Sequence, residues 1–354
     1  MSQLFTPVRV GRLTLPNRLV MAPMTRSRAD QDGVPGELTA TYYAQRADAG
    51  LIISEGVYPS AMGKGYIRTP GIATDAQMNG WQRVTNAVHA RGGRIFMQIM
   101  HCGRISHPAL LPDGALPVAP SAIKPAGQAW TPEGLQDFVT PRALNVAEIA
   151  AIIEDYRLAT RRALAAGFDG VELHAASGYL PEQFLSSGSN QRQDNYGGSL
   201  ENRVRFVREV LVAMAEEAGG DRVGIKISPE MGYNDITDAA PQETYAHLVE
   251  QLRDLHLAYL HVALFGAKTD YHALLAPRFD GAYLIGGGLD QAAAETLLTE
   301  NRAAAVVFGS AFLANPDLPE RFRQNAPLNT PDKATFFTPG PQGYTDYPTL
   351  GAAG

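Results

Sequence analysis

Eight short apolar segments, each bounded by turn residues, alternate along the chain with longer segments of helical periodicity. The apolar segments are rich in Val, Ile and Leu, a composition typical of parallel strands that are buried on both faces. They comprise Arg18–Ala22, Leu51–Ser54, Arg94–Ile99, Gly170–Leu173, Val223–Ile227, Tyr259–Ala263, Ala282–Ile285 and Ala304–Phe308. The amphipathic segments include Ala76–Arg91, Ala147–Ala166, Leu200–Glu217, Glu243–Leu255 and Gln291–Glu300. Eight strands that alternate with helices predict an α/β protein with the (β/α)8 architecture of a TIM barrel.

The competing α/β architecture is a doubly wound sheet, which needs a Gly-rich turn after its first strand. The chain instead reads Ala22-Pro23-Met24-Thr25 at that point, so the barrel is favoured. One barrel domain commonly takes up roughly 200 to more than 400 residues. Residues 1–354 are therefore predicted to form a single domain.

Two segments break the alternation of strands and helices. Residues 105–141 are rich in Pro and Gly and predict a hairpin or loop insertion after the third strand that caps the barrel mouth. Residues 327–354 show no helical period, so they are either disordered or form a strap that folds back over the barrel. Residues 190–203 are predicted to be a loop that leads into a helix capped near Ser199, with no chemical role.

Charge and composition exclude several classes of protein. The net charge is −6 with acidic and basic residues interspersed, which argues against a nucleic-acid surface. No run of about 18 apolar residues predicts a membrane span, and Met1–Pro7 lacks the features of a secretory signal, so we expect a cytoplasmic protein. The single cysteine, Cys102, excludes an internal disulfide, and with His101 it completes no zinc-ligand spacing. We expect no metal site, a structural His101 and a buried Cys102.

Polar residues and glycines follow most of the predicted strands. In a barrel these strand ends converge on one face, where the chemistry of the fold is carried out. His174, Ser177 and Tyr179 follow the fourth strand within six residues and offer hydrogen-bond donors and a proton source. Glycines follow the seventh and eighth strands, at Gly286–Gly288 and Gly309, where barrels commonly bind phosphate. The sequence therefore predicts a site for a phosphorylated ligand beside these three side chains.

Several motifs of the chain resemble the old yellow enzyme family, the FMN-dependent ene-reductases. They occur in family order and are Leu4–Pro7, Met21–Arg28, Gln98–Arg104, Asp169–Arg203, Phe308–Pro316 and Gly343–Pro348. The resemblance implies FMN lying across the barrel mouth. It implies contacts to the flavin from Ala22, Pro23, Met24, Thr25, Gly56, Gln98 and Lys226, and contacts to its phosphate from Gly287, Gly288, Gly309 and Ser310.

The resemblance also implies a reaction. NADPH or NADH reduces the flavin at N5, and an activated alkene, an α,β-unsaturated carbonyl or nitro compound, then takes its place. His174 and Ser177 bind the oxygen of this small-molecule partner, the hydride goes to the β-carbon, and Tyr179 protonates the α-carbon. Further substrate contacts are expected from Tyr66, Met100, Phe265 and Tyr344.

Three residues depart from the family pattern. Ser177 stands where relatives place His or Asn, and its shorter hydroxyl holds a carbonyl less firmly. Lys226 stands where relatives usually carry Arg, so it keeps the positive charge beside flavin N1 and O2 but not the planar fork. Ser310 stands where an Arg normally meets the phosphate, which predicts weaker retention of FMN.

Two alternatives remain open from the sequence. Lys226 at the end of the fifth strand could form a Schiff base in an aldolase-type barrel that acts on a phosphorylated substrate. Alternatively, the chain could bind flavin without turnover. The sequence is compatible with a monomer and with a homo-oligomer.

Overall fold

Eight parallel strands close into a barrel in the computed structural model, which describes residues 2–352. Every strand pairs with its neighbours in chain order, and β3 closes the barrel by pairing with β14. The strands are β3 (Leu19–Met21), β4 (Leu51–Ile53), β5 (Ile95–Ile99), β10 (Gly170–Ala175), β11 (Val223–Ile227), β12 (Tyr259–Ala263), β13 (Ala282–Gly286) and β14 (Ala305–Phe308). All eight coincide with the predicted segments, so the (β/α)8 barrel is confirmed.

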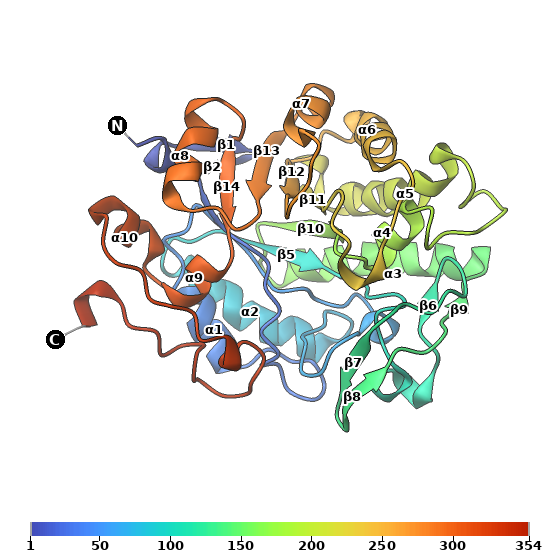
Figure 1. Cartoon of the computed structure of the whole chain (residues 1–354). Coiled ribbons are helices and arrows are strands. Elements are labelled where there is room, and N and C mark those ends of the chain that lie inside the picture. Colours follow the sequence, from blue (N-terminus) through green and yellow to red (C-terminus); the bar gives the residue numbers. More distant parts are fainter. Residues whose placement is uncertain (1, 353–354) are drawn as a thin grey trace.

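Helices surround the barrel on its outer side (Figure 1). Five were predicted: α2 (Asp75–His89), α3 (Val146–Ala165), α5 (Leu200–Ala218), α6 (Pro241–Gln251) and α8 (Gln291–Thr299). The others are short and were missed: α1 (Glu37–Ala44), α4 (Leu180–Leu185), α7 (Tyr271–Leu275), α9 (Ser310–Ala314) and α10 (Leu318–Gln324). Capping boxes at Thr74 and Asn145 begin α2 and α3, and the predicted Ser199 begins α5 by accepting the Asn202 N–H.

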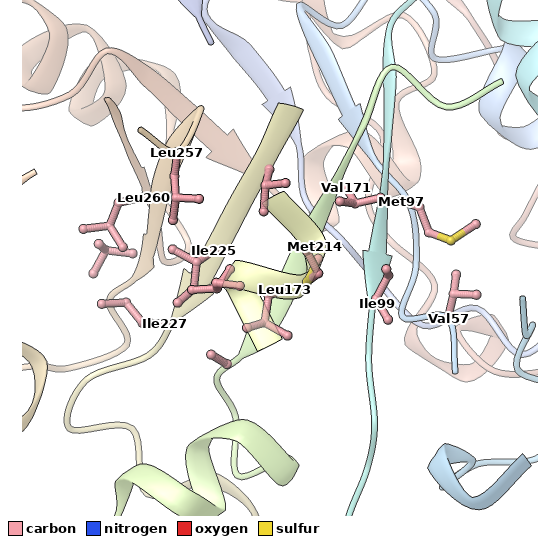
Figure 2. Packing of buried hydrophobic residues seen from close by; sticks show 14 of the residues in the cluster. Val57, Met97, Ile99, Val171, Leu173, Met214, Ile225, Ile227, Leu257 and Leu260 are labelled. Carbon is pink, nitrogen blue, oxygen red and sulfur yellow. The ribbon is translucent and has the colours of Figure 1, made fainter. Parts of the chain in front are cut away.

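The main hydrophobic core lies between the outer face of the barrel and the helices. Alternate residues of β5, β10 and β11 point outward into it, because successive side chains of a strand face opposite sides. Figure 2 shows this layer, with Met214 of α5 lying against the strands. The strand residues labelled in the figure are Met97, Ile99, Val171, Leu173, Ile225, Ile227 and Leu260.

A smaller apolar cluster fills the inside of the barrel at its N-terminal end. An antiparallel hairpin, β1 (Val8–Val10) and β2 (Leu13–Leu15), closes this end by packing Val10 and Leu15 against inward residues of the strands. Those inward residues are Val20, Leu51, Ile53, Phe96, Tyr259, Leu284, Ala305 and Val307. The hairpin therefore covers the N-terminal end of the barrel.

The insertion after β5 contains the predicted hairpin, formed by β7 (Gln128–Thr131) and β8 (Gly134–Asp137). Two very short strands, β6 (Val118–Ala119) and β9 (Arg142–Ala143), pair beside it. The C-terminal segment is a strap rather than a disordered tail. Over residues 327–352 it runs back past α1 and α9 with only two short 3-10 turns, Lys333–Thr335 and Leu350–Ala352 (Figure 1). Within the described residues, no helix combines the length and the apolar character needed to cross a bilayer.

Candidate active site

A cavity of about 220 Å³ opens where β11 to β14 and β3 end. Residues from all five strand ends line it. They include six of the residues predicted to bind the cofactor, namely Ala22, Lys226, Gly287, Gly288, Gly309 and Ser310. Phe265, predicted to contact substrate, also lines this cavity and is 53% exposed.

Two of the glycines of this cavity, Gly287 and Gly288, have backbone conformations that favour glycine. Gly287 has φ +142°, and a Cβ there would lie 2.0 Å from the Leu264 carbonyl oxygen. Gly288 has φ +76° and faces open space. A Cβ at Gly309 would meet only Met24 Sδ at 3.7 Å and Ala22 Cβ at 3.9 Å. The turns after β13 and β14 therefore leave bare backbone facing a hollow, which is the environment that a phosphate needs.

The segment after β3 and the turn after β4 complete this side of the mouth. Pro23, Met24 and Thr25 are partly exposed and free to contact a ligand. A Cβ at Gly56 would lie 2.5 Å from Met100 Cε, so the missing side chain allows Met100 to approach the backbone closely.

A hydrogen-bonded row of polar side chains crosses the barrel interior below the mouth. Gln98 Nε2 donates to Glu172 Oε1 at 2.7 Å, and His261 Nδ1 lies 3.0 Å from Glu172 Oε2. Since a carboxylate only accepts, Nδ1 of His261 carries the proton. All three side chains are at most 2% exposed. Lys226 lies beside the row, where burial lowers its pKa and the charges of Glu172 and Glu182 oppose that shift.

Gln98 was predicted as a flavin contact, but Glu172 and His261 were missed. The signal in the sequence was a carboxylate two residues before His174 in an apolar strand. Residues i and i+2 share one face of a strand, so Glu172 and His174 had to point the same way.

His174 lies at the C-terminal end of β10, opposite Lys226 in the pairing with β11. It is 5% exposed, and its Nδ1 is buried without a hydrogen-bond partner among the described residues. Burial lowers the pKa of His174 well below its usual value, and the nearby charges of Lys226 and His261 lower it further. The imidazole is therefore neutral at ordinary pH and has an uncommitted ring nitrogen.

Tyr179 and Tyr66 form a hydroxyl pair next to His174. The two hydroxyl oxygens are 2.8 Å apart, and the Tyr179 ring lies edge-on to His174 with 4.8 Å between centroids. Burial raises the pKa of Tyr179 well above 10, so the phenol stays protonated. Tyr66 was expected only as a pocket wall, and the structure makes it the hydrogen-bond partner of the predicted proton donor.

Ser177 occupies the turn between His174 and Tyr179, with φ +58°. Its N–H donates to Ser228 Oγ at 2.8 Å, and its carbonyl accepts from Asn234 Nδ2 at 2.8 Å. Gly178 follows with φ +77°, and its N–H donates to Glu182 Oε2 at 2.6 Å. The turn is therefore held by side chains that the sequence analysis did not identify.

An apolar cluster covers the Tyr66 and Tyr179 side of the mouth. It contains Met100 and Cys102 from the segment after β5 and the hairpin residues Ala129 and Phe138. Met100, predicted to contact substrate, is 4% exposed in this cluster. Cys102 is buried, as predicted, and burial raises the pKa of its thiol.

Tyr344 lies in the strap and has no exposed surface. Its ring stacks on Tyr42 with 4.1 Å between centroids, and the guanidinium groups of Arg26 and Arg28 lie over it at 5.0 and 4.5 Å. Both arginines also donate to strap carbonyls, including that of Gly343 at 2.7 Å from Arg26. In this structure Tyr344 anchors the strap, and its expected contact with substrate stays a prediction.

The predicted absence of a metal site involved His101 and Cys102. Among residues 2–352, no three His, Cys, Asp or Glu side chains are grouped as metal ligands. His101 is fully buried, its Nδ1 accepts the Gly103 N–H at 3.1 Å, and burial lowers its pKa to about 4. These contacts are those of a structural histidine.

Comparison with known families matches residues 3–329 to the NADH:flavin oxidoreductase / NADH oxidase family. Among curated proteins, the chain is 42% identical over 359 residues to a putative 12-oxophytodienoate reductase 3 of Oryza sativa subsp. japonica, covering 98% of this chain and 92% of that protein. It is 40% identical to 12-oxophytodienoate reductase 2 of Arabidopsis thaliana, covering 98% and 96%.

Two solved structures superpose closely on this one. Morphinone reductase in complex with tetrahydroNAD has a TM-score of 0.95 and 49% identity, covering 99% of this chain and 98% of that one. The old yellow enzyme homologue from Zymomonas mobilis has a TM-score of 0.96 and 40% identity, covering 98% and 100%.

Proposed function

The chain belongs to the NADH:flavin oxidoreductase / NADH oxidase family, of the old yellow enzyme type, and from that membership we propose that it reduces the activated C=C bond of α,β-unsaturated carbonyl or nitro compounds. It is an NAD(P)H-dependent FMN oxidoreductase. The observation that carries the proposed substrate class is the edge-on contact between the ring of Tyr179 and the ring of His174, whose Nδ1 has no hydrogen-bond partner among the described residues. An oxygen-binding group and a proton donor in contact are what the reduction of a polarised alkene requires.

The residues present fit FMN. Gly287, Gly288 and Gly309 would hold the phosphate, since their bare backbone faces the hollow. Lys226, on the same cavity, would place a positive charge beside the electron-accepting end of the isoalloxazine. When bound, FMN supplies hydride chemistry, taking a hydride from the nicotinamide and giving one to the alkene.

His174 binds the substrate oxygen in this proposal. As a neutral imidazole it can donate one N–H, and the donated bond strengthens as negative charge develops on the oxygen during reduction. His174 is only 5% exposed, and a hydrogen bond is stronger in such a buried place than in water. Ser177 adds a weaker second donor.

Tyr179 transfers the proton from its Oη to the α-carbon. If its own O–H is to point at the substrate, Tyr66 must donate to the Tyr179 oxygen in the 2.8 Å pair. With Tyr66 as the donor, the same bond would stabilise the phenolate that is left after transfer, since a hydrogen bond donated to the charged form favours it.

The two alternative functions, a Schiff-base aldolase-type barrel and a flavin-binding protein without turnover, are not supported. The Schiff-base barrel requires a different family, and it leaves the contact between His174 and Tyr179 without a role. A flavin-binding protein without turnover does not agree with membership of a family of oxidoreductases.

The test is an anaerobic experiment on FMN-supplemented protein. NADPH, or NADH in a parallel cuvette, is expected to bleach the flavin absorbance, and cyclohexenone is expected to restore it. Bleaching without recovery by cyclohexenone or by a nitroalkene would overturn the proposed substrate class.

Changing Ser177 to Asn is expected to tighten enone binding by about 2- to 10-fold, because a longer amide donor replaces a freely rotating hydroxyl. Asn also tolerates the left-handed backbone at φ +58° better than Ser does. The apparent Kd is measured from the concentration dependence of flavin reoxidation. Ser177→Ala is the matched control and should bind more weakly than wild type. Equal Kd values for Asn, Ser and Ala would contradict a role for this side chain.

Changing Ser310 to Arg is expected to lower the Kd for FMN by roughly 10- to 100-fold, the size of one charge-assisted hydrogen bond. Ser310 is exposed at the edge of the glycine-lined cavity, so a long side chain can be accommodated. Fluorescence titration of apoprotein with FMN measures the change. Ser310→Gln supplies the length without the charge and should gain little, and an equal gain for Gln would show that charge is not the cause.

A further inference from the structure

Glu182 is a buried carboxyl that the proposed chemistry does not use. It lies in the first turn of α4, directly after Tyr179, and is 2% exposed. Three donors point at it: the Gly178 N–H at 2.6 Å, the Tyr245 hydroxyl at 2.5 Å and the Ser228 hydroxyl at 3.4 Å. Burying a carboxyl is costly unless it is hydrogen-bonded, so this arrangement indicates a built contact rather than chance packing.

These contacts converge on the turn that carries the proposed substrate-binding groups. Gly178 donates to Glu182 directly, and Ser177 donates to Ser228, whose hydroxyl in turn faces Glu182. Both residues have positive φ, a backbone conformation that a non-glycine residue such as Ser177 adopts only when its surroundings hold it. The Gly178 N–H is therefore held by the Glu182 carboxylate directly, and the Ser177 N–H is linked to it through Ser228.

We propose that Glu182 is a positioning residue, whose carboxylate holds the Ser177–Gly178 turn so that His174 and Tyr179 face the alkene together. The inference rests on the proposed function. Glu182 does not touch the reacting atoms in this proposal, and its effect passes through the turn.

The charge of Glu182 is set by the groups that face it. Burial raises the pKa of Glu182 to about 7, hydrogen bonds from Tyr245, Gly178 and Ser228 oppose this rise, and the charge of Asp238 adds to it. Lys226 of β11 is the cation that faces Glu182. Tyr245 of α6 stays a neutral donor, because burial and Glu182 raise its pKa well above 10.

The sign of the pH effect follows from these donors. Above about pH 7 the carboxylate accepts all three hydrogen bonds. Below it, the carboxyl is neutral, and its hydrogen bond with the Gly178 N–H loses the extra strength that a charged acceptor gives, so the turn loosens. We expect the apparent affinity for cyclohexenone to fall by about 2- to 10-fold between pH 8 and pH 6, the size of one ordinary hydrogen bond. Burial lowers the pKa of His174 well below its usual value, so we do not assign the pH effect to His174.

The experiment measures the apparent Kd for cyclohexenone in the reoxidation of reduced holoenzyme from pH 5.5 to 8.5. In wild type the Kd is expected to change between low and high pH, and we call this change the pH step. Glu182→Gln is expected to abolish the pH step and to hold the Kd at the weaker, low-pH value at every pH. Glu230→Gln is the matched control. Glu230 lines the same surface cavity as Glu182 but accepts from Lys268, Thr269 and Tyr271 and not from the turn, so the step should persist.

Tyr245→Phe gives a second variant that separates positioning from a loss of folding. It removes a hydrogen bond that lowers the pKa of Glu182, so the step should move to higher pH. A role in folding alone would weaken binding equally at every pH. Glu55 is a second buried carboxyl, and burial raises its pKa to about 7. If the change in Kd with pH survives in Glu182→Gln, the titrating group is Glu55 and the proposal is overturned.

If cyclohexenone reoxidises no variant at any pH, the proposed function fails. If cyclohexenone reoxidises the enzyme with a Kd that does not depend on pH, the positioning role alone is overturned.

Discussion

Replacing Tyr179 by Phe is expected to slow reoxidation of the reduced enzyme by cyclohexenone by about 10²- to 10⁴-fold, the usual contribution of a positioned general acid. The substitution removes one oxygen and keeps the ring that contacts His174, so the shape of the mouth is preserved. Reduction by NAD(P)H needs no proton from this residue and should keep its rate. Stopped-flow measurement of the two half-reactions separates these outcomes.

Tyr196→Phe is the matched control for this prediction. Its hydroxyl donates to Glu209 at a different surface cavity, so both half-reactions should remain at wild-type rates. An unchanged reoxidation rate in Tyr179→Phe would remove Tyr179 as the proton donor. Equal slowing of both half-reactions would indicate a disturbed flavin site instead.

Replacing His174 by Phe is expected to slow reoxidation by cyclohexenone by about 10²- to 10³-fold, the cost of losing one donor to a developing oxyanion. Phe keeps a planar ring in a buried place but offers no N–H. The contribution of His174 should be independent of pH from 6 to 9, because burial lowers its pKa well below the usual value and favours the neutral ring. The measurement is the ratio of the wild-type reoxidation rate to that of His174→Phe at each pH from 6 to 9.

His272→Phe repeats the same substitution outside the cavity. His272 packs edge-on against Tyr283 and touches none of the proposed machinery, so its variant should reoxidise normally. A rate ratio for His174→Phe that changes tenfold between pH 6 and 9 would show that the imidazole titrates there and would contradict the neutral donor.

The barrel was predictable from the sequence because its strands are buried on both faces and read as short apolar runs. The long helices were predictable because their apolar stripes and caps, such as Asn145 with Glu148, lie close together in the chain. The short helices were not. Helix α1 buries Thr39, Ala40, Tyr42, Tyr43 and Ala44, a set that follows no single apolar stripe, and α4 is too short to show a period.

The residues of the candidate site also fall into those that were predicted from the sequence and those that were not. Residues that belong to contiguous motifs, such as His174, Tyr179 and the glycines after β13 and β14, were found by resemblance and lie where strand ends meet. The groups that hold them were missed. Tyr66 reaches Tyr179 across 113 residues, His261 reaches Glu172 across 89 and Tyr245 reaches Glu182 across 63.

By itself, the sequence determined the barrel, the order of its strands and the six predicted cofactor residues that line the cavity at its mouth, because these depend on local periodicity and on the convergence of parallel strand ends. The tertiary structure alone decided which buried polar groups pair. The register of a strand that is apolar on both faces cannot be predicted from its hydrophobic pattern, so the sequence does not show which residues of neighbouring strands face each other. Inside the barrel a buried polar group needs a hydrogen-bond partner, and only the folded chain shows which group that partner is.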